Sequence, residues 1–229
     1  YTSRIQGYVD VTLLKGLTFR MTQGFTFGDN VSRSTYGRDS YTTVMANGDK
    51  TSATATSTHN YSWTNQNILS YVKEFNRNHR INATAVFEQM YSDDFIHKTE
   101  AKGGLVSTII GANNTALGDV MYASGERTKT AMMSWMGRVN YVLMDRYMLT
   151  ASWRYDGSSR LDKDNRWEQF PSVALAWNAK QERFLRDVNF LSQLKLRVGY
   201  GETGNQAVEP YSAYTELEAT RDAQNHLAL

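Results

Sequence analysis

The chain contains no cysteine and only two prolines among its 229 residues. The absence of cysteine excludes disulfide bonds, thiolate metal sites and a cysteine nucleophile. The scarcity of proline suits long, uninterrupted β-strands, because each proline removes one donor from a hydrogen-bonded ladder. The chain also lacks any run of about 18 apolar residues, which excludes a transmembrane helix. Its net charge of +2 is too small to indicate a nucleic-acid partner.

Aromatic residues, in contrast, make up 12% of the sequence, although the mean hydropathy is negative. Apolar residues are therefore mixed with many polar ones, as in a sheet with one apolar and one polar face. Disordered chains lack this supply of aromatic and β-branched residues. The first residues carry no export signal with basic and apolar regions. We expect the chain to be part of a longer protein whose signal lies upstream.

Apolar and polar residues alternate over much of the chain, which predicts β-strands. The alternation is cleanest over residues 17–28, where only Gln23 interrupts the apolar face. That face carries Leu17, Phe19, Met21, Phe25 and Phe27. Comparable patterns predict strands at residues 2–14, 60–74, 79–92, 128–143, 147–156, 170–177 and 192–203. A weaker pattern suggests a ninth strand near residues 212–220.

Short turns and long polar segments connect the predicted strands in strict alternation. Short turns are predicted at residues 15–16, 76–78, 144–146 and, with a helical turn, 179–192. Long polar segments span residues 29–59, 93–126 and 157–168. Outer-membrane barrels have short periplasmic turns and long outer loops. The predicted strands also exceed the roughly 5–6 residues usual in globular sheets and reach the roughly 9–11 needed to cross a bilayer.

Aromatic residues on the apolar face gather near both ends of the predicted strands. Those near the long segments are Phe27, Tyr61, Tyr91, Tyr155 and Tyr200, and those near the short turns are Tyr71, Tyr141, Tyr147 and Trp177. Amphipathic rings favour the two interfaces of a bilayer. A sheet in lipid must close on itself, and the long segments favour a section of a wide barrel. The alternative is a soluble β-sandwich, whose strands are shorter.

Motifs that could carry chemistry are weak. Gly199-Tyr200-Gly201-Glu202-Thr203-Gly204 matches a dinucleotide-binding pattern, but no helix is predicted after it, so we interpret these glycines as strand-exit and turn residues. Asp162-Lys163-Asp164-Asn165 lacks the glycine of a calcium loop. The four histidines have no metal spacing, and the Ser158-Ser159 pair has no nucleophile-elbow context. The sequence predicts neither catalysis nor a metal or cofactor.

Candidate ligand-contacting residues lie in the predicted outer segments. They are Tyr36, Asn165 and Trp167, which stand among charged and amide side chains. Aromatic rings beside Asp, Asn and Arg suit contact with a sugar or a peptide. Ordinary packing within the loops is the alternative interpretation.

Three motifs in the second half of the chain carry a family resemblance. They cover residues 152–160, residues 165–167 together with 170–177, and residues 194–206. They resemble the barrel signatures of SusC/RagA-type TonB-dependent outer-membrane transporters, and the resemblance is good over about residues 147–206. The quoted motifs look structural, so no ligand-binding residue is carried over from the family.

The resemblance implies that residues 1–229 are an all-β, antiparallel segment of about 8–9 strands from a 22-stranded transmembrane barrel. It implies a plug domain and further strands outside this sequence, and energy delivered by TonB. It also implies a SusD-type surface lipoprotein as a lid, and oligosaccharides or peptides as cargo imported across the bacterial outer membrane. Two other classes stay open, namely a passive porin or other barrel scaffold, and a soluble carbohydrate-binding β-protein.

Overall fold

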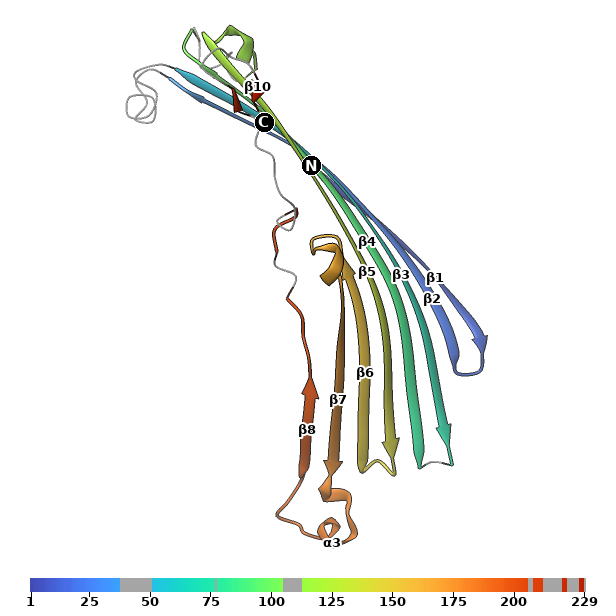
Figure 1. Cartoon of the computed structure of the whole chain (residues 1–229). Coiled ribbons are helices and arrows are strands. Elements are labelled where there is room, and N and C mark those ends of the chain that lie inside the picture. Colours follow the sequence, from blue (N-terminus) through green and yellow to red (C-terminus); the bar gives the residue numbers. More distant parts are fainter. Residues whose placement is uncertain are drawn as a thin grey trace. The chain divides into compact units, whose positions relative to one another are not determined.

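The computed structural model describes residues 1–37, 51–76, 78–104, 113–205, 208–211, 220–221 and 227–228. Eight strands form one sheet in chain order, so that each strand lies beside the next (Figure 1). The strands are β1 (Thr2–Leu14), β2 (Leu17–Tyr36), β3 (Ser52–Phe75), β4 (His79–Lys102), β5 (Val120–Leu143), β6 (Tyr147–Ser158), β7 (Trp167–Asn178) and β8 (Lys195–Gly201). The predicted all-β, antiparallel class is confirmed.

Helical structure in the described residues is limited to single turns. These are η1 (Thr115–Leu117), η2 (Lys163–Asn165), η3 (Ala179–Gln181) and α3 (Arg183–Arg186). No helix in the described part of the chain is long and apolar enough to cross a membrane. The helical turn predicted between residues 179 and 192 is confirmed, because η3 and α3 both lie in this range.

Contacts between residues divide the chain into two units. Unit 1 comprises Tyr1–Tyr8, Thr22–Asn65 and Met90–Lys129, and unit 2 comprises Val9–Met21, Gln66–Gln89 and Thr130–Leu229. Unit 1 contains the strand ends next to two of the predicted long segments. Unit 2 contains the tight turns and all of β6, β7 and β8.

Strand pairing in unit 2 keeps one register without a slip. Tyr141 pairs with Leu149, Leu149 with Leu175, and Leu175 with Val198. Because side chains alternate between the two faces of a strand, this row places four apolar side chains on one face. The neighbouring row begins with the polar pair Asn140–Thr150, in which the Thr150 hydroxyl donates a hydrogen bond of 2.9 Å to the Asn140 side chain.

No part of the chain that the structure describes forms a layer over the apolar face. Among the described residues only three hydrophobic side chains are buried, all of them alanines: Ala53, Ala101 and Ala179. Large apolar side chains such as Leu175 (53% exposed) and Val198 (68% exposed) remain open. A contiguous apolar surface of this kind marks a protein or membrane contact.

Two of the predicted long segments are wrong over much of their length. β2 continues to Tyr36, β3 begins at Ser52, β4 continues to Lys102 and β5 begins at Val120. The prediction failed because the alternation ends where both faces become polar, whereas the backbone ladder between neighbouring strands continues. Residues 38–50 and 105–112 lie outside the described residues. The predicted segment at 157–168 is confirmed between β6 and β7.

The end of the sheet also differs from the prediction. The strand predicted at residues 192–203 is shorter, because β8 spans Lys195–Gly201. Residues 212–219 of the suggested ninth strand lie outside the described residues. The described residues beyond them form two short strands, β9 (Thr220–Arg221) and β10 (Leu227–Ala228), which pair with each other.

The predicted tight turns at residues 15–16 and 144–146 are confirmed, and both contain positive φ angles. In the turn predicted at residues 76–78, where Arg77 lies outside the described residues, Asn76 also has a positive φ of +50°. Gly16 has φ +84°, and its carbonyl accepts a hydrogen bond of 2.7 Å from the backbone amide of Val72. Met144 and Asp145 have φ +55° and +56°, as in a type I′ hairpin turn. This second turn is therefore built from residues for which a left-handed conformation costs about 1 kcal/mol or more.

Replacing Gly16 with alanine should reduce the amount of folded protein. A Cβ at this position would meet the backbone carbonyl of Val72, and the positive φ adds a penalty of about 1–2 kcal/mol. Gly7→Ala is the matched control, because a Cβ there meets nothing within 4 Å. The measurement is the folded fraction of the full-length protein. Equal folded fractions for the two variants would contradict the prediction.

Candidate functional site

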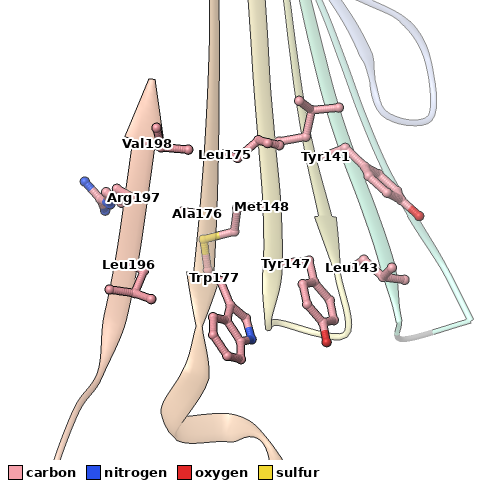
Figure 2. A pocket seen from close by; sticks show the side chains of 11 residues that line it. Tyr141, Leu143, Tyr147, Met148, Leu175, Ala176, Trp177, Leu196, Arg197 and Val198 are labelled. Carbon is pink, nitrogen blue, oxygen red and sulfur yellow. The ribbon is translucent and has the colours of Figure 1, made fainter. Parts of the chain in front are cut away.

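A shallow groove lies on the apolar face of unit 2, beside the tight turns (Figure 2). It has a volume of about 400 Å³. Its apolar walls come from four neighbouring strands and include Tyr141, Leu143, Tyr147, Leu149, Leu175, Trp177, Leu196 and Val198. The unbroken register of β5 to β8 therefore aligns these side chains into one surface.

Glu182 fixes the polar ends of two rings in the groove. The Tyr147 hydroxyl and the Trp177 ring nitrogen donate to the same carboxylate oxygen, over 2.6 and 3.2 Å. Arg146 pairs with the other oxygen at 3.2 Å. The Tyr147 hydrogen bond, followed by that from Trp177, lowers the pKa of Glu182. Both rings therefore end at the turn with their polar atoms satisfied and their apolar parts in the groove.

A second group of aromatic rings lies on the apolar face toward the other end of β6. Trp153 and Tyr155 stack with centroids 5.7 Å apart, and Tyr155 stacks on Trp167 at 4.9 Å. Gly157 pairs with Trp167 across the strands, and a Cβ on Gly157 would lie 2.6 Å from that indole. Tyr147 and Tyr155 are eight residues apart, or about 26 Å along a strand, which is comparable with the apolar band of about 25 Å in outer-membrane barrels.

Unit 1 carries its own aromatic row across β2, β3 and β4. Phe27 and Tyr61 have ring centroids 5.3 Å apart, and Tyr61 and Tyr91 are 6.4 Å apart. These residues were predicted to lie at strand ends, but the strands continue well beyond them. The row therefore marks the place within the strands where this face changes from apolar to polar side chains.

Polar and charged side chains lie beyond this aromatic row on the same face, two residues away from it on each of the three strands. His59 Nδ1 lies 2.5 Å from an Asp29 oxygen, and Arg127 donates two hydrogen bonds of 2.9 and 2.8 Å to Asp93. The Asp93 side chain is only 15% exposed, so the two bonds from Arg127 compensate for much of its lost contact with water. With Phe95, these residues line a pocket of about 410 Å³.

Known proteins with similar sequences are bacterial receptors. TonB-dependent receptor SusC of Bacteroides thetaiotaomicron is 53% identical over 90 residues, which are 39% of this chain and 9% of that receptor. TonB-dependent receptor P3 of Formosa agariphila is 31% identical over 226 residues, which are 95% of this chain and 21% of that receptor. The chain is homologous to the SusC-type TonB-dependent receptors. No protein-family model matches it.

Solved structures agree with this relationship at the level of the fold. The RagAB peptide transporter matches with a TM-score of 0.86 and 20% identity, over 99% of this chain and 25% of that chain. The same importer in "open-open" and "closed-closed" states matches with TM-scores of 0.84 and 0.82. The chain spans only 9–21% of the length of the curated receptors named above. The predicted resemblance to the SusC/RagA type is confirmed.

The motifs that carried the resemblance to the SusC type have structural roles in this chain. Asp156 is buried and pairs with Arg154 at 2.7 Å. The glycines of the Gly199–Gly204 pattern also serve packing, since a Cβ on Gly201 would lie 3.0 Å from that of Ser172. Gly201 ends β8, and residues 202–205 contain no helix. The interpretation as a strand-exit residue is confirmed for Gly201, whereas Gly199 lies within β8.

The three predicted ligand-contacting residues are distributed over both units. Asn165 is exposed at the end of η2, and Trp167 begins β7 two residues later. Tyr36 is the last residue of β2, 40% exposed, and belongs to unit 1. Asn165 and Trp167 thus lie on one connection, with Trp167 stacked on the apolar face.

Sequence reasoning missed Glu182 and the charged side chains of unit 1. Glu182 lies 35 residues from its partner Tyr147, and no local pattern connects them. Asp29, His59 and Asp93 could have been found, because they continue the alternation of Phe27, Tyr61 and Tyr91 by one further step. The polar residues around them hid this continuation.

Protonation of Glu182 should release the Trp177 ring. The folded-state pKa lies below its ordinary value of 4.5, so stabilisation by the carboxylate is complete above pH 4.5 and is lost as the pH falls through the lowered pKa. The fluorescence of Trp177, obtained by subtracting a Trp177→Phe variant, should therefore change only at acidic pH. Glu182→Gln should abolish this pH dependence. A titration unchanged in Glu182→Gln would contradict the assignment.

Proposed function

We propose that the chain forms part of the barrel wall of a bacterial outer-membrane receptor that imports large nutrients with energy from TonB. The observation that carries this proposal is homology to SusC, together with a continuous sheet whose apolar face carries aromatic rows. The relatives are named as receptors and as a transporter, which supports transport rather than catalysis.

The proposed whole protein is much longer than this chain. We place residues 1–229 in the barrel domain and expect a plug domain, the TonB-contacting segment and the other strands of a 22-stranded barrel elsewhere in the protein. A SusD-type surface lipoprotein would act as the lid. The "open-open" and "closed-closed" states of the RagAB importer support a moving cover in this family.

The long strands of unit 1 support large cargo. β2 continues for nine residues from Phe27 to Tyr36, or about 30 Å beyond the aromatic row. Walls of this length would extend the binding surface well outside the bilayer. We propose oligosaccharides or peptides as cargo, and the likeness of the fold to RagAB, a peptide transporter, supports the second class.

Uptake by cells tests this function. A strain without the receptor should fail to deplete the cargo from a mixture of oligosaccharides and peptides, measured by mass spectrometry of the medium. A strain without TonB should fail equally. Uptake that persists without TonB would favour a passive porin, and recovery of the full-length protein from the soluble fraction without detergent would favour a soluble binding protein. Either result would overturn the proposal.

We keep Tyr36, Asn165 and Trp167 as proposed cargo contacts. Replacing each with alanine should raise the cargo concentration for half-maximal uptake by roughly two- to tenfold, the range of one aromatic or hydrogen-bond contact. Trp167→Phe is the control, because it keeps the stack on Tyr155. Trp167→Ala could instead lower only the amount of folded receptor, which quantitative blotting of outer membranes measures. If Trp167→Ala lowers the amount of receptor but leaves the cargo concentration for half-maximal uptake unchanged, Trp167 packs on the membrane face and does not contact the cargo.

A further inference from the structure

We propose that two features of unit 2 together bind one anionic glycerophospholipid of the periplasmic leaflet. They are the groove beside the tight turns, described above, and the segment of residues 180–190 next to it, called the basic segment below. The inference rests on the membrane placement proposed above, because short turns face the periplasm in outer-membrane barrels. It goes beyond transport, since it assigns a specific lipid site to a surface that would otherwise contact any lipid.

The groove has the chemistry of an acyl-chain site. Its volume is about 400 Å³, its walls are formed mostly by apolar side chains, and none of the described residues forms a layer over them. Leu175, Leu196 and Val198 are 53%, 54% and 68% exposed. Figure 2 shows these side chains around the groove, with Tyr147 and Trp177 at its turn end. A flexible hydrocarbon chain can fill such an open surface without any polar partner.

The basic segment begins where the groove ends. Glu182, which bonds to both Tyr147 and Trp177, immediately precedes α3. The Lys180 ammonium donates to the carbonyls of Leu185, Arg186 and Val188, over 3.0, 3.2 and 2.7 Å. The residues of α3 are therefore held next to the polar ends of the groove rings.

Two arginines of α3 supply the charge for a lipid phosphate. Arg183 and Arg186 are exposed, and neither guanidinium makes a hydrogen bond or ion pair within the part of the chain that the structure describes. Two acids adjoin these arginines in sequence. Glu182, before Arg183, is already bonded to Tyr147, Trp177 and Arg146, and Asp187, after Arg186, is exposed and forms no ion pair with either arginine among the described residues. Guanidinium groups bind phosphate oxygens through two parallel hydrogen bonds, so this end of the groove is complementary to an anionic headgroup.

Exposed phenylalanines on the same segment support contact with a membrane. Phe184 is 69% exposed and Phe190 is 93% exposed. Aromatic residues are enriched at the level of lipid headgroups, and apolar rings beside Arg and Lys are typical of segments that lie in the interface. This observation separates a bilayer lipid from a free phosphate in solution, because a free phosphate would gain nothing from these rings.

Native mass spectrometry of the full-length receptor in detergent tests the proposal. The receptor is mixed with equal amounts of phosphatidylglycerol and phosphatidylethanolamine, and retained lipids are counted. We expect preferential retention of one phosphatidylglycerol. Arg183→Ala/Arg186→Ala should reduce that preference by up to about thirtyfold, since each basic residue contributes about 1 kcal/mol toward anionic lipid. Arg183→Lys/Arg186→Lys should retain most of it.

The matched control removes the same charge elsewhere. Arg33→Ala/Lys163→Ala replaces exposed basic residues of β2 and η2 and should leave the preference unchanged. Val198→Trp, which fills the groove, should reduce retention of both lipids. Equal retention of the two lipids by the unmodified receptor, or equal loss in both alanine variants, would overturn the lipid site. Those results would leave the proposed transport intact, whereas failure of the receptor to enter membranes would overturn both.

Discussion

A strand surrounded by lipid must find every backbone partner on the strands beside it, because lipid offers no hydrogen bonds. In the membrane placement proposed above, the rest of this structure depends on that constraint. The pairing of β5 through β8 shows how it is met, with one register from Met132–Ser158 to Asn178–Lys195. A slip by one residue would exchange the two faces of a strand and would place Thr150 and Asn140 among Tyr141, Leu149 and Leu175. The apolar pattern and the hydrogen-bonded ladder therefore enforce the same arrangement.

The register also explains how distant residues come to share one surface. Tyr147 opens β6 and Trp177 lies near the end of β7, yet they pair across the strands. Glu182 can therefore accept from both rings at once, and its own position depends on η3 and α3 after β7. Gly157 has a comparable role at the other end of β6, because its missing side chain leaves room for the Trp167 indole. The aromatic rows follow from pairing and from a few small residues, since the single layer has no core to hold them.

Residues with strong alternation allowed the fold to be predicted from sequence. Phe19, Met21 and Phe25 indicate both a strand and its apolar face, and Lys15-Gly16 indicates the turn before it. The extensions of β2 to β5 could not be predicted in the same way. Threonine and alanine alternate before His59, but both types tolerate water, so the pattern carries no face preference. Glu182 could not be assigned because its partners become neighbours only after the strands pair. The motifs at residues 152–160 and 194–206 indicated the SusC-type resemblance for a different reason, since they contain packing details such as the Arg154–Asp156 pair and the close approach of Gly201 to Ser172.

In unit 1 the side chains on one face change from aromatic to polar or charged within two residues on each of three strands. Phe27 precedes Asp29, Tyr91 precedes Asp93, and His59 precedes Tyr61. Two residues correspond to roughly 7 Å along a strand. Raising the sheet by that distance would lift the rings out of the apolar layer, and lowering it would draw the Asp93–Arg127 pair into hydrocarbon. Both displacements are unfavourable, so in the membrane placement proposed above this part of the wall has a defined depth in the bilayer. A bilayer of different thickness would therefore have to thin or thicken next to the protein.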